Sequence, residues 1–234
     1  MPEGGKDLTM KGILSYDSKL MVMLGHLADT MLLNIMFLIT CVPLVTVGAA
    51  FSALFAGSRA VAEQRGWFKA YWRAFRDNFL RATLVWLILL PVGLALAWAL
   101  WFCWTNKLGG YMPAFICACV AMALVLSTLQ MALLFYSRFE VGLGRLLKNG
   151  LLLVLSYPLR GLFIGITNWL PVLFFFVMPY TFQQLTIIWL FLYFGTAASL
   201  SAWLMKRPFE TLIQDMEDME RAIEEYEKAH AEDE

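Results

Sequence analysis

Few side chains in this sequence could do chemistry, and three of them lie close together in the first apolar stretch. His26 and Asp29 are three residues apart, which places them on one face of a helix. Asn34 follows five residues later, roughly 140° around the helix axis. Ionisable and amide groups inside a membrane are costly and often functional. These three residues are therefore a candidate intramembrane polar site for a transported solute. The alternative is structural: hydrogen bonds between helices, with Asp29 near water and paired to a loop arginine.

Other groups that could carry chemistry are sparse. The two histidines, His26 and His230, lie at opposite ends of the chain, and most carboxylates follow residue 207. The sequence has no HExxH, GxSxG or Gly-rich phosphate-binding motif. Four cysteines lie in apolar stretches without CxxC spacing, and we expect small buried side chains there: Cys41, Cys103, Cys117 and Cys119. We expect no enzyme, and no catalytic, metal-binding or cofactor-binding residues.

The composition indicates an integral membrane protein. Of the 234 residues, 60% are apolar and 15% are charged, and the mean hydropathy is +0.66. Soluble chains are about 45–50% apolar and about a quarter charged. A chain this apolar has too few polar residues to cover its surface in water. We therefore expect the lipid bilayer to surround it as a partner. Secreted disulfide scaffolds, nucleic-acid-binding domains and disordered chains are excluded.

Six apolar stretches are long enough to cross a bilayer, which takes about 20 helical residues. They lie at roughly 19–42, 44–61, 79–104, 111–136, 161–179 and 183–205. We predict an all-α transmembrane bundle over residues 19–207, preceded by a cytoplasmic segment, 1–18. Residues 150–157 would lie at the interface or form a kinked turn. The second stretch is barely long enough, so the alternative is a re-entrant helix, five spans and an external N-terminus.

The distribution of Lys and Arg predicts the orientation. Residues 62–81 contain five of them and residues 137–149 contain three, and Lys206 and Arg207 follow the last span. The alternate connections contain only Lys107 or none. Because cytoplasmic loops are enriched in Lys and Arg, we predict a multi-pass protein with both termini in the cytoplasm.

Aromatic residues recur at helical spacing between residues 62 and 81, with cations among them. The aromatic positions are Trp67, Phe68, Tyr71, Trp72, Phe75 and Phe79. This pattern predicts an amphipathic helix, about 66–78, in the cytoplasmic interface, with its aromatic side chains in lipid and its cations, Lys69, Arg73 and Arg76, toward the lipid phosphates. Its role would be anchoring or, alternatively, docking of a partner.

Residues 208–234 form an acidic tail with a heptad pattern. Eleven Asp and Glu residues stand there against Arg221 and Lys228. Apolar residues alternate in steps of three and four: Phe209, Leu212, Met216, Met219, Ile223 and Tyr226. This a/d stripe predicts a helix of about three heptads, supported by i,i+4 ion pairs such as Glu217 with Arg221. It would pack on its own protein, pair with itself or bind a partner helix.

Two blocks of sequence resemble the YesL family of bacterial membrane proteins. The first runs from Asp29 and Asn34 through Pro43-Leu-Val-Thr46-Val-Gly48-Ala-Ala to Ala53-Leu54, and the second is Phe75-Arg-Asp-Asn78-Phe79 followed by Ala82-Thr83 and Trp86. Tyr16-Asp-Ser-Lys-Leu20 also fits. The resemblance implies a small polytopic protein of the bacterial cytoplasmic membrane without established biochemistry, found near carbohydrate-uptake systems and especially ABC importers. It supplies no catalytic residues.

The residues that match the family motifs are expected to be structural. Pro43 and Gly48 would permit a tight external turn between the first two spans. Thr46 and Asn78 lie where helices are predicted to start, as N-caps do. Small residues at Ala49, Ala53 and Gly57, and a second set at Gly161 and Gly165, predict close helix packing.

The resulting functional expectation is an accessory or scaffold component of a carbohydrate ABC uptake system. Its partners would be importer subunits, contacted through the interfacial helix and the tail, or a second copy of the chain. The alternative is a small-solute transporter or channel that uses the polar residues around Asp29 and Asn34.

Cysteines placed at Arg73 and Arg145, in a variant without the native cysteines, should not react with an impermeant maleimide added outside intact cells. Both positions are predicted to face the cytoplasm, so they should react only after permeabilisation. Labelling from outside would contradict the orientation, and release of the protein from vesicles by alkaline carbonate would contradict membrane integration.

Overall fold

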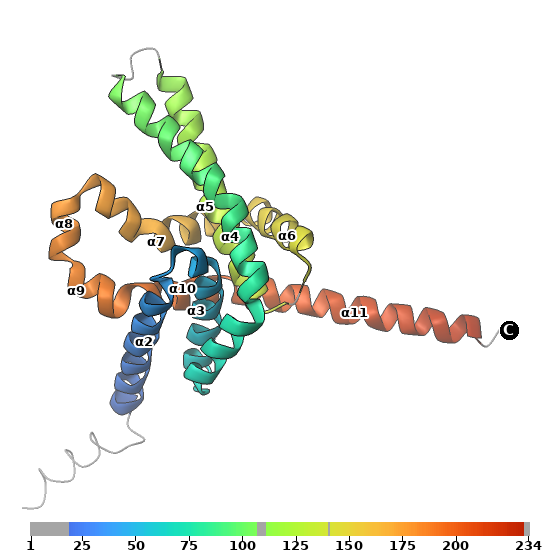
Figure 1. Ribbon diagram of the computed structural model, residues 1–234. Helices are drawn as coiled ribbons and strands as arrows, with labels where there is room; N and C mark the ends of the chain where they lie inside the picture. The colour runs from blue at the N-terminus through green and yellow to red at the C-terminus, as the bar shows by residue number, and fades with distance from the viewer. Residues whose placement is uncertain (1–18, 107–110, 140, 232–234) are drawn as a thin grey trace, which may run out of the picture.

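A computed structural model describes residues 19–106, 111–139 and 141–231 (Figure 1). The predicted N-terminal segment, 1–18, lies outside these residues. The helices are α2 (Lys19–Cys41), η1 (Leu44–Thr46), α3 (Val47–Ala62), α4 (Trp67–Thr105), α5 (Met112–Tyr136), α6 (Leu143–Ser156), α7 (Pro158–Val177), α8 (Pro179–Gln184), α9 (Thr186–Ile188), the π-helix η2 (Trp189–Tyr193), α10 (Phe194–Leu204) and α11 (Lys206–Ala231). The described part of the chain contains no strand, which confirms the all-α prediction.

Six helical segments are long and apolar enough to cross a membrane, as predicted. They are Leu20–Cys41, Leu44–Ala62, Trp67–Thr105, Met112–Tyr136, Pro158–Val177 and Thr186–Leu204. The second of them, for which the alternative prediction is a re-entrant helix, is the central helix of the fold. In its apolar window 72% of the residues are buried, against 17–28% in the other five. α3 therefore faces protein on most sides, while the surrounding helices expose apolar surface to lipid.

Small residues explain why α3 can occupy the centre. A Cβ atom at Gly48 would lie 2.3 Å from the carbonyl oxygen of Ala82 in α4, and one at Gly57 would lie 2.6 Å from Leu33 in α2. The prediction that Gly48 serves the turn is wrong, because Gly48 lies inside α3 and lets the α4 backbone approach. The second small-residue set packs similarly: a Cβ at Gly165 would lie 2.8 Å from the Ser127 Cα atom in α5.

The predicted boundary between an interfacial helix, 66–78, and the third span is not present. Residues 67–105 form one continuous helix, because no Gly or Pro breaks the helical pattern between them before Pro91. The aromatic residues of its first turns also do not all face lipid. Tyr71 is completely buried and bonded to the Thr40 hydroxyl, whereas Phe68 and Trp72 are exposed.

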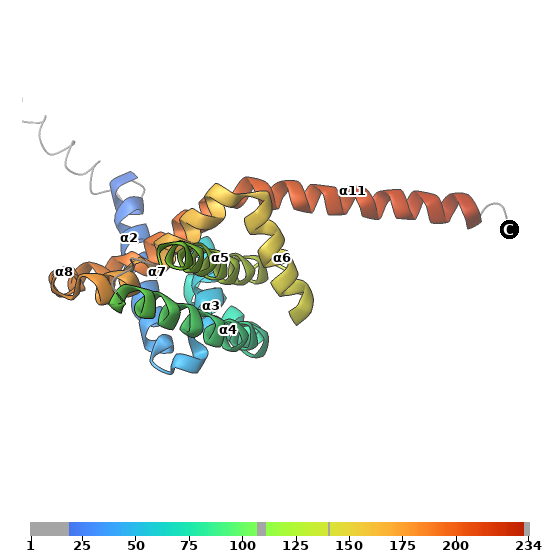
Figure 2. The same cartoon turned by 90° about the horizontal axis from the view of Figure 1, so that it is seen from above.

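Two parts of the chain extend from this core in different directions, the outer halves of α4 and α5 and the segment from α7 through α8 and α9 (Figures 1 and 2). The outer half of α4 exposes Trp98, Trp101 and Trp104. Cys117 and Cys119 are exposed on the outer half of α5, so the prediction of buried cysteines is wrong for these two. The sequence could not distinguish the two cases, because a cysteine that faces lipid and a cysteine buried in protein both lie in apolar stretches.

The chain bends at Tyr157, shortly before the fifth predicted span, 161–179. α6 ends at Ser156 and α7 begins at Pro158, and Tyr157 has φ −130° and ψ 63°. A residue before proline is disfavoured in the α conformation, which explains the bend and agrees with the kinked turn predicted for 150–157. α6 itself begins earlier, at Leu143, in a stretch predicted to be a connection.

Gly48→Ala should lower the melting temperature of the detergent-purified protein, because the new Cβ would clash with the α4 backbone at Ala82. Overpacking of this kind typically costs about 1–3 kcal/mol. Gly93→Ala is the matched control, since nothing lies within 4 Å of a Cβ at that position of α4. Equal melting temperatures for the two variants would contradict the close α3–α4 approach.

Candidate functional site

Asn34 joins α2 to the π-helix η2 rather than lining an open path. Its side chain is fully buried. The Nδ2 group donates hydrogen bonds to the carbonyl oxygens of Trp189 at 3.1 Å and Leu190 at 2.5 Å, and Oδ1 accepts one from the Gly195 N–H at 2.9 Å. All the usual donors and one acceptor position of the amide are thus occupied by backbone.

The local structure of η2 explains why an amide is needed at this point. A π-helix shifts hydrogen bonding to i→i+5 and disturbs the regular backbone ladder where it begins and ends. In a membrane every backbone polar group requires a partner within the protein. Asn34 supplies partners at both ends of η2, and Gly195 allows the approach, since a Cβ there would lie 2.8 Å from Thr30. The sequence analysis identified Asn34 but missed Gly195. A glycine within an apolar run, as Gly195 is, indicates a close contact between helices.

His26 and Asp29 contact a different part of the molecule from Asn34. The Trp67 indole N–H donates to Asp29 Oδ1 at 2.9 Å, which fastens α2 to the first residue of α4. The His26 ring lies 3.3 Å from the Gln64 side-chain amide, nitrogen to nitrogen. The expected partner of Asp29 was a loop arginine; within the described residues it is Trp67. The three predicted polar residues therefore serve separate contacts and are not brought together.

The motif residues Pro43, Thr46 and Asn78 are structural, but not as helix caps. The Thr46 hydroxyl donates to the carbonyl oxygens of Thr40 at 2.6 Å and Pro43 at 2.7 Å, which closes the turn between α2 and α3. Thr46 occupies the N-cap position of α3 without capping it. Asn78 lies in the interior of α4 and donates to the Ser52 hydroxyl at 2.8 Å, so the N-cap prediction for it is wrong and its role is to join α4 to α3.

Further buried polar contacts join helices in the core. Asn168 of α7 donates to the Ser201 hydroxyl of α10 at 3.0 Å, as expected for an intramembrane amide. Gln130 of α5 is equally buried, and neither polar atom of its amide has a partner in the described part of the chain. The contact between Asn168 and Ser201 thus joins α7 to α10.

The acidic tail forms the long helix α11, which begins directly after α10 and projects away from the bundle (Figures 1 and 2). Among the α11 side chains that the structure describes, those of the first turns pack on the protein: Phe209 is completely buried against Phe135 and Phe139. Further along the stripe Met216, Met219 and Ile223 are 48%, 65% and 52% exposed. The side chain of Tyr226 lies outside the described residues.

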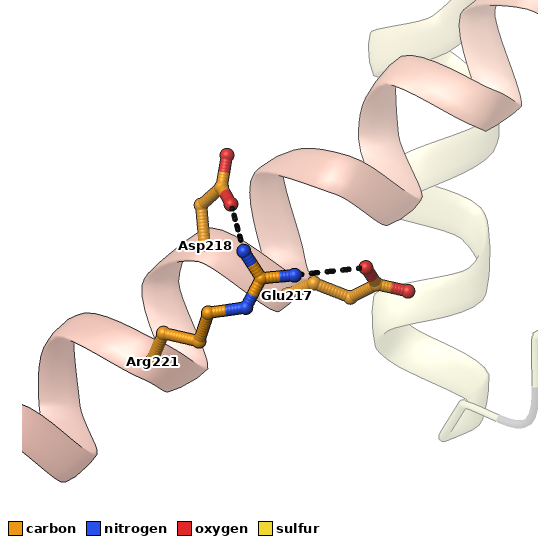
Figure 3. Close-up of polar contacts among 3 residues, drawn as sticks. All are labelled: Glu217, Asp218 and Arg221. Carbon is orange, nitrogen blue, oxygen red and sulfur yellow. Dashed lines mark hydrogen bonds and ion pairs between the residues drawn. The ribbon is translucent and has the colours of Figure 1, made fainter.

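Ion pairs support the exposed part of α11. Arg221 lies 3.6 Å from Glu217 and 3.3 Å from Asp218 (Figure 3). The i,i+4 pair with Glu217 confirms the sequence prediction, and Asp218 adds an i,i+3 partner. Exposed pairs of this kind contribute only about 0.3–0.5 kcal/mol each, so they help the helix to form without packing it on anything.

A cleft of about 430 Å³ lies where α3 ends, α4 begins and the chain leaves α5. We call it the basic cleft, because five cations line it and Asp77 is the one carboxylate: Arg59, Arg65, Lys69, Arg73 and Arg138. The sequence alone assigns most of these cations to the orientation of the chain, and Lys69 and Arg73 also to contacts with lipid phosphates. Arg59 was not considered, although a cation inside an apolar stretch is a signal for a buried contact.

The cations of the basic cleft are held by different neighbours. The Arg59 guanidinium donates to the Ser137 carbonyl oxygen at 2.9 Å, and Arg65 forms an ion pair with Glu63. The Arg138 guanidinium carbon lies 5.0 Å from the centre of the Phe209 ring, a cation–π contact with the base of α11. Burial lowers the pKa of Arg138, and the nearby Glu63 and Glu210 oppose the shift. The guanidinium stays charged at neutral pH because the ordinary pKa of arginine is so high.

Residues 30–100 match the model of a family described as "Protein of unknown function, DUF624". The matched stretch contains the Asn34 contact, the turn at Pro43 and Thr46, all of α3, and the α4 cations of the basic cleft. No curated protein and no solved structure matches the chain. The residues that carry the resemblance, 16–86, therefore overlap the stretch that matches this family of unknown function.

Asn34→Leu should destabilise the protein by about 1–3 kcal/mol or more, because it leaves two carbonyl groups and one N–H unpaired in an apolar environment. The measurement is thermal unfolding in detergent. Asn106→Ala is the control, since Asn106 is exposed at the end of α4 and bonds only within its own helix, to the Phe102 carbonyl oxygen. A loss no larger than that of the control would contradict the clamping role of Asn34.

Proposed function

We propose that this protein is an accessory or scaffold component of a bacterial carbohydrate ABC uptake system, and that α11 is its contact surface for a partner on the cytoplasmic side. The observation that carries the proposal is the exposed apolar stripe of α11. Met216, Met219 and Ile223 are all about half exposed or more on a helix that leaves the bundle after its first turns.

An exposed stripe of this kind needs a partner to be stable. Most of the stability of a helix in a protein comes from the packing of its apolar face, and heptad apolar residues contribute most when a facing helix buries them. The base of α11 is already fixed by Phe209, so the helix is presented in a set direction. Such preorganisation lowers the ordering cost of binding.

The charges beside the stripe favour a basic partner helix over a second copy of the chain. With Phe209 and Leu212 at positions a and d, the flanking e and g positions hold Asp215, Glu220 and Glu227 and no cation. Two copies of α11 would place these acidic residues opposite one another, and like charges at e and g oppose pairing. A partner with Lys and Arg at those positions would be complementary.

The link to carbohydrate uptake rests on the resemblance of residues 16–86 to the YesL family, whose members occur near ABC importers. The match of residues 30–100 to a family of unknown function covers most of the same stretch, which supports the view that this stretch is the common core of the family. The proposal includes both termini in the cytoplasm, where importer subunits that bind nucleotide are found. Transport by the chain itself has less support, because backbone groups occupy the Asn34 amide and Trp67 occupies Asp29.

A photo-crosslinking amino acid placed at Met219 should form an adduct with an importer subunit in native membranes, because this position lies on the exposed stripe. The same amino acid at Gln214, an exposed position on the opposite side of the heptad, should give several-fold less. The adducts are identified by mass spectrometry.

A matched pair of charge variants links the contact to function. With the crosslinking amino acid moved to Met216, which is also exposed on the stripe, Met219→Asp should abolish the partner adduct, whereas Gln214→Asp should leave it unchanged. In cells without the crosslinker, Met219→Asp should slow oligosaccharide uptake and Gln214→Asp should not. Equal adducts from the two crosslinker positions would contradict the stripe as the contact surface. An adduct of two copies of the chain would replace the proposed partner with self-association.

A further inference from the structure

We propose that the basic cleft is a binding site for a phosphoryl group, supplied either by an anionic lipid headgroup or by a soluble phosphate. This goes beyond the scaffold role of α11 and rests on a different part of the molecule. The cleft lies at the end of the bundle that is predicted to face the cytoplasm, where both sources occur.

The first argument is an excess of positive charge without anionic partners. Of the five cations, Arg65 is paired with Glu63. Considering the residues that the structure describes, no carboxylate lies within ion-pair distance of Arg59, Lys69, Arg73 or Arg138. A single carboxylate, Asp77, lines the cleft with them. Glu63 and Glu210 are near enough to act on Arg138 but form no ion pair with it, so an anion bound between these groups would be their first direct ionic partner.

The second argument is that the positive-inside rule does not account for the inner cations. Exposed residues such as Lys69 satisfy that rule at little cost. Arg59 and Arg138 are only partly exposed, and removing a guanidinium from water is unfavourable unless hydrogen bonds or an opposite charge replace the water. One bond to Ser137 uses one of the five donors of Arg59, so most of its hydrogen-bonding capacity remains for a ligand.

The third argument is that the two inner guanidinium groups are held in place. The Ser137 carbonyl oxygen fixes Arg59 and the Phe209 ring supports Arg138. Arginine binds phosphate through two parallel N–H groups, and an oriented planar group loses less entropy when it does so. Lys69 and Arg73, one helical turn apart on α4, add cations at the rim.

The shape of the cleft also suits a small anionic group. Alanines line it on both sides, Ala56 and Ala60 on α3 and Ala70 and Ala74 on α4. Their short side chains create the hollow, whose volume of about 430 Å³ lies within the usual range of about 300–1,000 Å³ for ligand sites. Asp77 could not bind the phosphoryl group itself, but its carboxylate can accept a hydrogen bond from a hydroxyl group on the same ligand.

The test compares two double variants of the full-length protein in neutral detergent. Arg73→Gln with Arg138→Gln removes two cations from the cleft. Arg76→Gln with Arg145→Gln removes one cation from α4 and one from α6, and neither of these residues lines the cleft. Both variants lose the same net charge, so a difference between them reports on position rather than on general electrostatics.

Binding is measured with two probes, inorganic phosphate by calorimetry and phosphatidylglycerol by native mass spectrometry against phosphatidylcholine. The cleft variant should weaken binding by about tenfold or more, which corresponds to the loss of one charge-assisted contact or more. The control variant should bind as the unmodified protein does. Binding of inorganic phosphate would identify a soluble ligand, and binding of phosphatidylglycerol alone would identify a lipid headgroup.

Ala70→Leu provides a second test that keeps every charge. Its larger side chain would fill the cleft at α4, so it should also abolish binding of the probe that the unmodified protein binds. The proposal is overturned if neither probe binds, if both double variants weaken binding equally, or if Ala70→Leu binds as tightly as the unmodified protein.

Discussion

The close approach of α3 to its neighbours is the contact on which the rest of this structure depends. In a bilayer the hydrophobic effect does not drive helices together, so their association relies on dispersion contacts and on hydrogen bonds that short side chains make accessible. Gly48 lets the backbone of α4 reach α3 at a distance that a Cβ atom would prevent, and Gly57 makes room for the Leu33 side chain of α2. The buried bond from Asn78 to Ser52 joins the same two helices, α4 and α3. The turn at Thr46 and the start of α4 at Trp67 are both placed by this packing.

The polar residues inside the bundle act mainly as fasteners between helices. Asn34 joins α2 to η2, Asp29 joins α2 to α4, and Asn168 joins α7 to α10. Each contact satisfies groups that would otherwise be unpaired in hydrocarbon. The cations of the basic cleft are distributed differently. They lie at one end of the bundle, where α3, α4 and the end of α5 meet beside the base of α11. The bundle thus separates a polar framework inside from a charged surface at one end.

Much of the fold could be predicted from the sequence, because spans are local features. A run of about 20 apolar residues identifies a span wherever it packs, so the six stretches and the tail helix were found correctly. Helix boundaries depend on more than composition. The predicted boundary between the interfacial helix and the third span, at residue 78, is absent because no residue there ends a helix. Asn78 was predicted to be an N-cap, but it bonds instead to Ser52, 26 residues away in the chain. The site was harder still, since Arg59 and Arg138 meet only after α3 and α5 have packed.

The tryptophans at the outer end of the α4–α5 hairpin have a consequence for how the molecule sits in lipid. Trp98, Trp101 and Trp104 are all exposed there, and indole rings favour the zone of the headgroups. They would hold the hairpin tip at a fixed depth, as the cations do at the other end. A bilayer thicker or thinner than the distance between these two anchors would then be met by a change in hairpin tilt, while α3, shielded from lipid, would keep its packing.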